Sequence, residues 1–486
     1  MFKTIKVLIL IFALNISSSY AKENYQGKTL HILTHEIPVI GEPTVLHAKE
    51  FEKLTGVKVI VHHVSFDKLY QEALRGLKKG KYDIVFYGSL WIADFYKYIE
   101  PLPKKVLESD TYKDILPHYK NIAKWGDIAY NFTIDGDRHY FQYRSDLFEN
   151  STYKKEYKHR YSEELKVPKT WKELNHIAKF FNKKTLNDGK TIYGISEITK
   201  KEDLLFSNFI KRAASYAKHP EIKDGFYFDL KTMKPLINTP GFVEALKDFV
   251  DAGNYYPPKG NEFGILDTIE SFGKGQSAFT DGWDDSFIKA MEKESGLSNK
   301  VQTSMSLGSL KVWNRKTAKW DYFQKPHYVP YFAFGWTSAV SRESKNKDLA
   351  FDYLLYFTND KNHFKDLTIG HFGINPYRKA DFNEEFWKNE AKWNHKAAKS
   401  YIETLNQINH HNNWLTDLRI YESRKYMKAL AIGVHRALTK RSTPKDALDE
   451  VAKRWERITK KVGIEKQREA YSHVVNLENS QYNLEE

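Results

Sequence analysis

Most residue patterns that perform covalent chemistry are missing from this sequence. It contains no cysteine. It also has neither a G-x-S-x-G motif, which presents a serine nucleophile, nor a P-loop or G-x-G-x-x-G motif, which binds phosphates. The histidine pairs His62-His63 and His410-His411 are adjacent, whereas zinc ligands on a helix recur at i and i+4. The sequence therefore favours binding without catalysis, and we expect no cofactor and no metal site.

One acidic segment carries a candidate for ligand contact. Asp281-Gly282-Trp283-Asp284-Asp285 places an indole ring in a polar loop, outside any apolar helical stripe. Two carboxylates this close in sequence are typical of a turn followed by a helix N-cap. A pair of carboxylates is also what a glycoside hydrolase uses, so that class of enzyme stays an alternative. Because an exposed indole gains little unless a ligand covers it, Trp283 predicts a stacking surface for a sugar or polyol.

Composition leaves further ligand classes open. Tyr255-Tyr256 fits a ferric-ion binder, and the formal charge of +14 fits an organophosphate. The lysines are scattered singly or in pairs among acidic residues, which is typical of a solvated surface, so we expect no nucleic-acid partner. Aromatic residues make up 15% of the chain, and this content allows a site that stacks on sugar rings.

Residues 1–21 have the features of an export signal. Lys3 and Lys6 precede the apolar run 7–14, and Ser19-Tyr20-Ala21 places small residues at a cleavage site. The apolar run is too short to span a bilayer, and a chain without cysteine cannot carry the lipid of a lipoprotein. We expect cleavage after Ala21 and a protein that is free in a bacterial periplasm.

The elements that must position these residues begin with an alternation of strands and helices. The pattern predicts three strands and two intervening helices, at residues 29–34, 44–54, 57–64, 66–78 and 82–87. Strands joined by single helices form a mainly parallel sheet, whose ligands lie beyond the carboxyl ends of the strands. Tyr87 and Trp91 lie at such an end.

Capping residues mark three later helices, and the length of the chain predicts two lobes. The helix starts are Thr170 with Glu173, Thr239-Pro240 and Thr443-Pro444. A chain of 486 residues exceeds the size that one hydrophobic core supports. Since no low-complexity linker is present, we expect crossing segments to join the lobes.

In their order, the motifs resemble those of the family 1 extracellular solute-binding proteins, the maltose-binding-protein class that serves ABC importers. Examples are Tyr82-Asp83-Ile84-Val85-Phe86 and Pro168-Lys169-Thr170-Trp171. The other matching segments are 51–59, 143–148, 193–195, 272–279, 335–341, 344–357 and 443–463. The resemblance covers nearly the whole mature chain.

This resemblance implies a type II periplasmic binding protein fold. Each lobe would be α/β, with a mainly parallel sheet flanked by helices, and crossing hinge segments would join the two. The implied N-terminal lobe comprises residues 22–134 and 331–405, and the C-terminal lobe comprises 135–330 and 406–486.

The resemblance also implies ligand-contacting positions. Those that match or neighbour contact positions of the family are Tyr87, Trp91, Asp137, Trp283, Trp336 and Tyr426. Adjacency adds Arg138 and Asp281. Rings would stack on the ligand, Asp137 would accept hydrogen bonds from its hydroxyls, and Arg138 would donate to its oxygens. Because the loop near Trp91 lacks the Asp-Arg pair of the maltose receptor, a monosaccharide or polyol fits as well as a maltodextrin.

The implied function is capture without chemistry. A monomeric periplasmic receptor would close on a sugar or polyol and deliver it to the membrane permease subunits of an ABC importer. The alternatives are a periplasmic glycoside hydrolase that uses Asp137 and Asp281, or a binder of ferric ion or an organophosphate.

Overall fold

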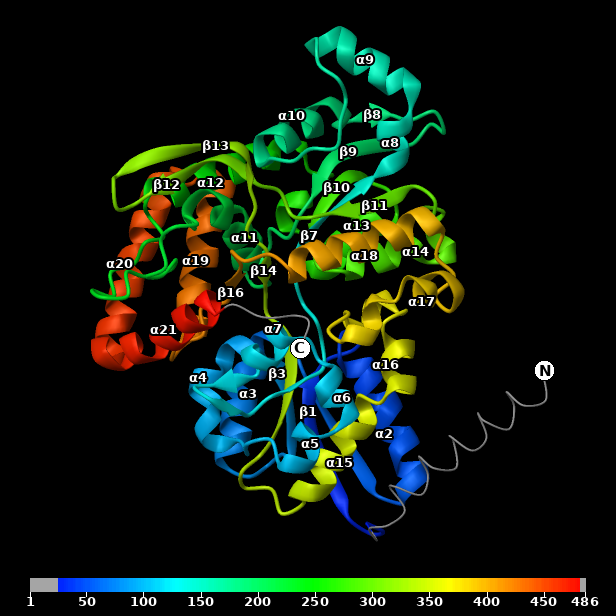
Figure 1. Cartoon of the computed structure of the whole chain (residues 1–486), viewed down its shortest axis with the longest axis vertical. Coiled ribbons are helices and arrows are strands. Elements are labelled where there is room, and N and C mark those ends of the chain that lie inside the picture. The colour runs from blue at the N-terminus through cyan, green and yellow to red at the C-terminus, as the bar shows by residue number, and fades with distance from the viewer. Residues whose placement is uncertain (1–24, 481–486) are drawn as a thin grey trace, which may run out of the picture.

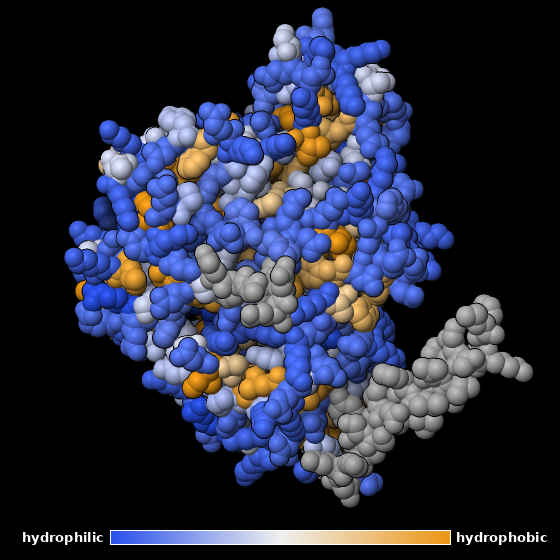
Figure 2. Space-filling view, in the orientation of Figure 1, coloured by the Kyte–Doolittle hydropathy of each residue, from blue (hydrophilic) through white to orange (hydrophobic). Residues whose placement is uncertain are grey.

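A computed structural model describes residues 25–480 of the chain, so the predicted signal peptide lies outside the described residues. Two five-stranded sheets occupy the lower and upper halves of the molecule, and helices cover each of them (Figure 1). Within residues 25–480, no helix is both long and apolar enough to cross a membrane. The face seen in Figure 2 is mainly hydrophilic, with its apolar residues in small separate patches.

The first sheet has the strand order β2-β1-β3-β15-β6. Its strands are β1 (Thr29–His35), β2 (Lys58–Val64), β3 (Ile84–Gly88), β6 (Phe132–Thr133) and β15 (Trp336–Val340). β1 pairs in parallel with β2 and β3, whereas β15 is antiparallel to both β3 and β6. The alternation predicted between residues 29 and 87 is confirmed.

The helices of this lobe surround its sheet. They are α2 (Gly41–Thr55), α3 (Phe66–Lys78), α4 (Ile92–Phe95), α5 (Lys104–Leu107), α6 (Asp110–Asp114), α7 (Pro117–Ile122), α15 (Lys347–Phe357) and α16 (Asp360–Asp366). A short hairpin, β4 (Lys124–Trp125) with β5 (Ile128–Ala129), precedes β6.

The second sheet has the order β11-β7-β10-β9-β8. Its strands are β7 (Tyr140–Arg144), β8 (Lys184–Thr185), β9 (Thr191–Ser196), β10 (Ser277–Gly282) and β11 (Val301–Ser304). Only β9 and β10 pair in parallel, so this sheet is mixed, whereas we expected a mainly parallel one. The reason is that β7 enters directly from the other lobe, and not through a helical crossover.

Helices and a hairpin complete the second lobe. The helices are α8 (Ser145–Glu149), α9 (Ser151–Tyr161), α10 (Trp171–Phe181), α11 (Leu205–Ala217), α12 (Pro240–Ala252), α13 (Ile265–Gly273), α14 (Asp285–Met291), α18 (His395–Asn409), α19 (Ser423–Leu438), α20 (Pro444–Val462) and α21 (Ile464–Asn479). The hairpin joins β12 (Ser309–Asn314) to β13 (Lys319–His327).

The predicted helix starts are all present. The Thr170 hydroxyl accepts a hydrogen bond from the Glu173 amide, and the Glu173 carboxylate accepts one from the Thr170 amide, which together form a capping box. α12 begins at Pro240 after Thr239, and α20 begins at Pro444 after Thr443, whose hydroxyl accepts from the Asp446 amide. The three predicted helix starts are therefore confirmed. They could be predicted because side chains within four residues of each start form the cap.

Within residues 25–480, the chain crosses between the two sheets three times. The first crossing is 134–139, between β6 and β7. The second is 328–335, which includes β14 (Tyr331–Phe332), and the third is 367–394, which includes α17 (Glu384–Asn389). The predicted lobe bounds at 134 and 330 lie at the first two crossings. Residue 405 lies within α18, which contacts β11. The exact division of the chain stays a prediction.

Candidate functional site

Two buried carboxylates of the first crossing hold the other two crossings in place. Asp135 accepts hydrogen bonds from the backbone amides of Asn375, at 2.8 Å, and Trp336, at 3.4 Å. Asp137 accepts from the Gly335 amide and from the Asn375 side-chain amide, both at 3.2 Å. Asp137, predicted to accept from ligand hydroxyls, therefore contacts the hinge backbone.

The electrostatics of this pair follow from its burial. Burial raises the pKa of Asp135 to about 7. Burial, followed by the nearby Asp135 charge, raises the pKa of Asp137 well above its ordinary value. The pair thus retains a proton at a pH where solvent-exposed carboxyls are ionised. Gly136 lies between the two because a Cβ there would overlap the carbonyl oxygen of Pro376.

Arg138 joins the first crossing to the second lobe through a fully buried ion pair. Its guanidinium lies 3.0 Å from the Asp284 carboxylate. It also donates to the Tyr119 hydroxyl at 2.7 Å and to the Pro376 carbonyl at 2.6 Å. Asp284 occupies the N-cap position of α14, but its carboxylate accepts from Arg138 and from the Tyr401 hydroxyl, with no side-chain cap bond. Its three side-chain hydrogen bonds therefore link the first crossing to the first lobe, to the third crossing and to the second lobe.

Asp281 and Trp283 lie at the end of β10, and both are buried. The Lys211 ammonium is 3.0 Å from the Asp281 carboxylate, which also accepts from the Ser306 hydroxyl at 2.8 Å. Trp283 is 4% exposed, and the centroid of its indole lies 4.1 Å from the centroid of the His139 ring. Gln142 donates to the Trp283 carbonyl at 2.6 Å. Trp283 is thus held at the boundary with the crossings and away from bulk solvent.

A cavity of about 200 Å³ is lined by both lobes. Trp91 lies on it, and its ring packs edge-on against Tyr70 and Phe334 at centroid distances of 5.3 and 5.8 Å. The other lining residues come from the first lobe, the second crossing, the segment that leads into α11 together with its first turn, and α19: Phe66, Asp67, Leu90, Phe334, Lys201, Glu202, Asp203, Phe206, Arg424, Met427, Lys428, Ala431 and Ile432. This cavity combines aromatic rings with charged groups.

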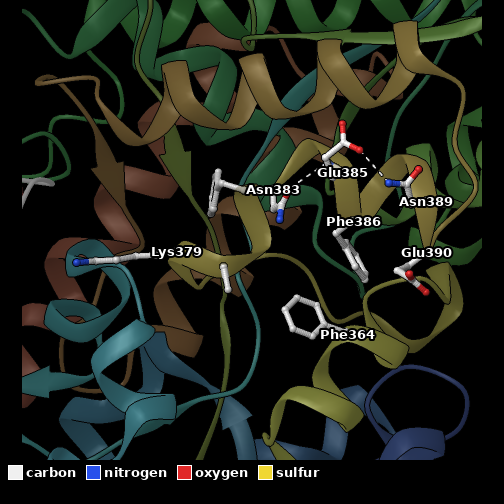
Figure 3. A pocket seen from close by; sticks show the side chains of 9 residues that line it. Phe364, Lys379, Asn383, Glu385, Phe386, Asn389 and Glu390 are labelled. Atoms are coloured by element: carbon white, nitrogen blue, oxygen red, sulfur yellow. Dashed lines mark hydrogen bonds between the residues drawn. The ribbon is translucent and has the colours of Figure 1, made fainter. Parts of the chain in front are cut away.

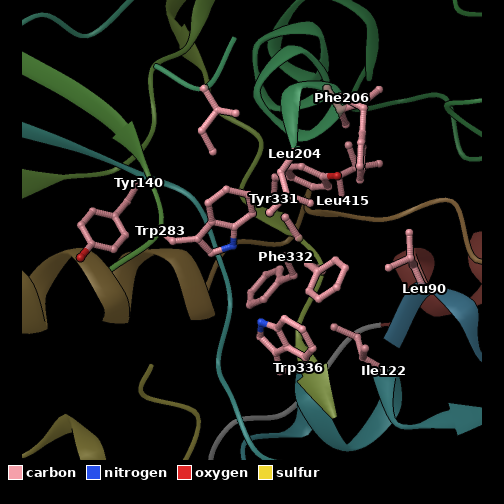
Figure 4. Close-up of a cluster of buried hydrophobic side chains, with 14 of the residues drawn as sticks. Leu90, Ile122, Tyr140, Leu204, Phe206, Trp283, Tyr331, Phe332, Trp336 and Leu415 are labelled. Atoms are coloured by element: carbon pink, nitrogen blue, oxygen red, sulfur yellow. The ribbon is translucent and has the colours of Figure 1, made fainter. Parts of the chain in front are cut away.

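Trp336 lies close to Asp135 and Asp137. The three residues line a smaller cavity of about 10 Å³, together with Phe332 and Phe334. In Figure 4, the Trp336 indole lies below Phe332, and Trp283 lies above it. The two predicted stacking indoles therefore approach the lobe boundary from opposite sides.

Tyr87 and Tyr426 are not among the residues that line the 200 Å³ cavity. The Tyr87 hydroxyl donates to the Asn131 side chain in the interior of the first lobe. Tyr426 is fully buried between α19 and α20, packs edge-on against Trp455, and hydrogen-bonds Thr459. Its neighbour Met427 lines the cavity.

A larger pocket lies on the third crossing (Figure 3). It has a volume of about 540 Å³, and its lining residues are Phe364, Lys379, Ala380, Phe382, Asn383, Glu385, Phe386, Asn389 and Glu390. None of the predicted ligand contacts is among them. Because α16 and the third crossing alone form this pocket, lobe closure would not enclose it.

The structure also gives partners to the residues considered for metal binding. Tyr256 donates to the buried Glu197 carboxylate at 3.1 Å, and Tyr255 lies near Asp251. One ring nitrogen of His62 is 3.1 Å from one of His31. Within residues 25–480, no group of three or more His, Cys, Asp or Glu is arranged to hold a metal ion.

Sequence reasoning missed Asp135 and His139. Both belong to the polar run Asp135-Gly136-Asp137-Arg138-His139, which lies between the buried strands β6 and β7. All five of these residues are buried. This run of charged residues between two apolar strands could have indicated a buried polar network, because buried charges need partners.

Two lobes, three crossings and a cavity between the lobes form the architecture of a two-lobed binding protein. The sequence pattern of the bacterial extracellular solute-binding proteins matches residues 47–394. The chain belongs to this family, which confirms the resemblance inferred from its motifs.

Solved structures have the same fold. A solute-binding protein of an ABC transporter from Agrobacterium radiobacter, in complex with ribitol, is 19% identical, with a TM-score of 0.70 over 90% of this chain and 100% of that one. Maltose-bound MalE3 of T. maritima is 19% identical, with a TM-score of 0.68 over 89% and 100%. A protein from Agrobacterium vitis with bound D-mannitol is 18% identical, with a TM-score of 0.68 over 90% and 99%. Among curated proteins, none matches the sequence.

Proposed function

We propose that this protein captures a sugar or polyol between its lobes and delivers it to the permease subunits of an ABC importer. The observation that carries the proposal is the 200 Å³ cavity, which the rings of Trp91, Phe66 and Phe334 line together with charged residues of the second lobe at 201–203. Aromatic faces suit the C–H surface of a sugar, and charged or polar groups suit its hydroxyls. The ligands named for the similar structures, ribitol, D-mannitol and maltose, support the same class.

The size of the cavity favours a small ligand. Pockets for drug-sized molecules measure about 300–1,000 Å³, and this cavity measures about 200 Å³. A monosaccharide or an alditol therefore fits better than a maltodextrin. Since Asp137 holds the hinge and Asp281 pairs with Lys211, their contacts favour binding over glycoside hydrolysis.

Capture requires the lobes to open and close, with the crossings as the hinge. A ligand that touches both lobes stabilises the closed form. Reversal of a 99:1 open preference needs about 5.5 kcal/mol of differential binding, and a micromolar complex supplies about 8 kcal/mol in total. In this proposal the chain is exported, is cleaved after Ala21, carries no lipid and acts as a monomer in the periplasm.

Thermal unfolding with a ligand panel tests the proposal. The panel comprises ribitol, D-mannitol, D-tagatose and maltose, with glycerol 3-phosphate and a ferric salt as the rival classes. A ligand at about 100 times its Kd adds about 2.7 kcal/mol of stability, so at least one sugar or polyol should raise the Tm. Trp91→Leu should reduce this shift, whereas Trp313→Leu, in the hairpin of the second lobe, should retain it. A Tm raised only by the ferric salt or the phosphate would refute the proposal.

A further inference from the structure

The outer end of the second lobe carries a concentration of positive charge. Residues 151–190 contain 11 lysines and arginines against five aspartates and glutamates, a net charge of +6, while the full sequence has a formal net charge of +14. Ten of these 11 basic residues are exposed to solvent. The segment forms α9, α10 and β8, which lie together at the top of the molecule in Figure 1. A short part of the chain thus places six net positive charges at one end of the protein.

A stripe of tyrosines fixes α9 to the rest of the second lobe. Tyr153, Tyr157 and Tyr161 recur at every fourth residue, so they lie on one face of the helix. The Tyr157 ring packs edge-on against Phe180, with centroids 5.1 Å apart, and the Tyr161 ring packs edge-on against His176 at 4.4 Å. α9 is therefore held in place although it projects from the top of the molecule (Figure 1).

The solvent-facing side of α9 is basic. Lys154, Lys155 and Lys158 are all exposed. Lys158 lies 2.6 Å from the exposed Glu164 carboxylate, whereas Lys154 and Lys155 form no ion pair within residues 25–480. Of the large hydrophobic residues that are exposed, none belongs to 151–190, and the top of the molecule is mainly hydrophilic in Figure 2. This side of the helix can attract an anionic partner but has no large apolar side chain to insert into it.

The spread of the charges favours an extended anionic surface over a small anion. A site for a small molecule needs polar groups that converge in a cavity, and none of the basic residues of 151–190 lines a cavity described above. They are distributed over the outside of α9, α10 and the β8–β9 hairpin instead. Anionic phospholipids form such an extended surface, and each lysine or arginine close to it strengthens binding about fivefold.

We propose that the basic residues of 151–190, with α9 at their centre, bind the second lobe peripherally to a membrane surface that contains anionic phospholipids. The attachment is electrostatic and reversible, because no apolar group anchors it. It goes beyond the proposed function and does not depend on a ligand, since none of these residues lines the 200 Å³ cavity. A receptor bound in this way would diffuse along the membrane surface, where its concentration near membrane-embedded partners is higher than in free solution.

Co-sedimentation with lipid vesicles tests the proposal. The probes are vesicles of phosphatidylcholine alone and of an equal mixture of phosphatidylcholine and phosphatidylglycerol. The protein is produced from residue 22 onward, so that the apolar run 7–14 cannot contribute to binding. It should sediment with the anionic vesicles and not with the neutral ones. Because the Debye length falls from about 10 Å at 0.1 M salt to about 3 Å at 1 M, high salt should release the protein.

Two triple variants with the same loss of net charge locate the binding surface. The test variant removes the exposed lysines of α9: Lys154→Gln, Lys155→Gln and Lys158→Gln. The matched control removes three exposed lysines of α20: Lys453→Gln, Lys460→Gln and Lys461→Gln. At about fivefold for each charge, the partition coefficient of the α9 variant should fall at least tenfold, while the control stays close to the wild type.

Each other outcome would overturn the proposal. Equal binding to both kinds of vesicle, or binding to neither, would show that anionic lipid is not the partner. Equal losses in the two triple variants would show that net charge matters and that α9 does not. Binding of soluble polyglutamate through the α9 lysines, without binding to vesicles, would assign the surface to an acidic protein instead. The Tm response of the α9 variant to the ligand panel should match the wild type, so a panel without any response would refute the proposed function and leave the vesicle result unchanged.

Discussion

The protonated carboxyl pair at the hinge predicts an unusual pH dependence of stability. Asp135 and Asp137 have raised pKa values in the folded protein, whereas in the unfolded chain both ionise near pH 4. Between pH 4 and about 7 the folded state therefore holds a proton that the unfolded state has released. The stability that this proton contributes is fully present below pH 4 and is lost as the pH rises toward 7.

The size of the effect follows from this window. One retained proton changes the free energy of unfolding by about 1.4 kcal/mol per pH unit. For Asp135, whose pKa is raised to about 7, the window spans about three units and the loss reaches about 4 kcal/mol. Asp137→Asn mimics the protonated acid, since its amide can donate to Asp135 and its carbonyl can accept from Gly335. The variant should therefore be more stable than the wild type above pH 7, and its stability should vary less between pH 4 and 7.

Urea unfolding of both proteins at pH 5, 6, 7 and 8 measures this difference. Asp188→Asn, in the exposed turn before β9, removes a charge without touching the hinge and should track the wild type at every pH. If the curves for wild type and Asp137→Asn stay parallel across this range, the hinge pair does not hold a proton and the reasoning is wrong.

Two further predictions concern stability, each measured by urea unfolding at pH 7. Arg138→Met leaves the buried Asp284 carboxylate without its cation and should lower the free energy of unfolding by about 3–5 kcal/mol. The double variant with Asp284→Leu should regain most of this loss. A double variant no more stable than Arg138→Met would contradict the ion-pair account. Thr170→Ala removes the hydroxyl that caps α10 and should lower the free energy of unfolding by about 1 kcal/mol. Thr170→Ser keeps a hydroxyl and should lower it less. Equal losses in the two variants would show that the hydroxyl does not stabilise the helix.

Local elements could be predicted from the sequence because neighbouring residues determine them. The capping box at Thr170 and the start of α20 at Thr443 involve side chains within four residues of each other. The parallel pairing of β1 with its two neighbours follows from single-helix connections. The antiparallel pairing of β7 with β10 and β11 had no such local signal, because β7 reaches its sheet through a crossing.

Of the eight residues predicted to contact a ligand, Trp91 lines the 200 Å³ cavity between the lobes. Its position was predictable because a parallel strand ends shortly before it. Tyr426 was expected in the same cleft, but the packing of α19 against α20 turns that residue inward and presents Met427 to the cavity. The partner of Arg138 lies 146 residues away at Asp284, so adjacency in the chain could not reveal that pair. Whether the predicted residues touch a ligand stays a prediction.

The parallel pairing of β14 with β16 (Leu415–Thr416) has a mechanical consequence. Tyr331 pairs with Leu415 and Phe332 with Thr416, so the second crossing is bonded to the segment that leads into α19. A rotation of that crossing would therefore move α19, and with it α20 and α21, which pack against one another on the outside of the molecule. In the proposed function, closure of the lobes would therefore also move the outer helices α20 and α21, far from the cavity itself.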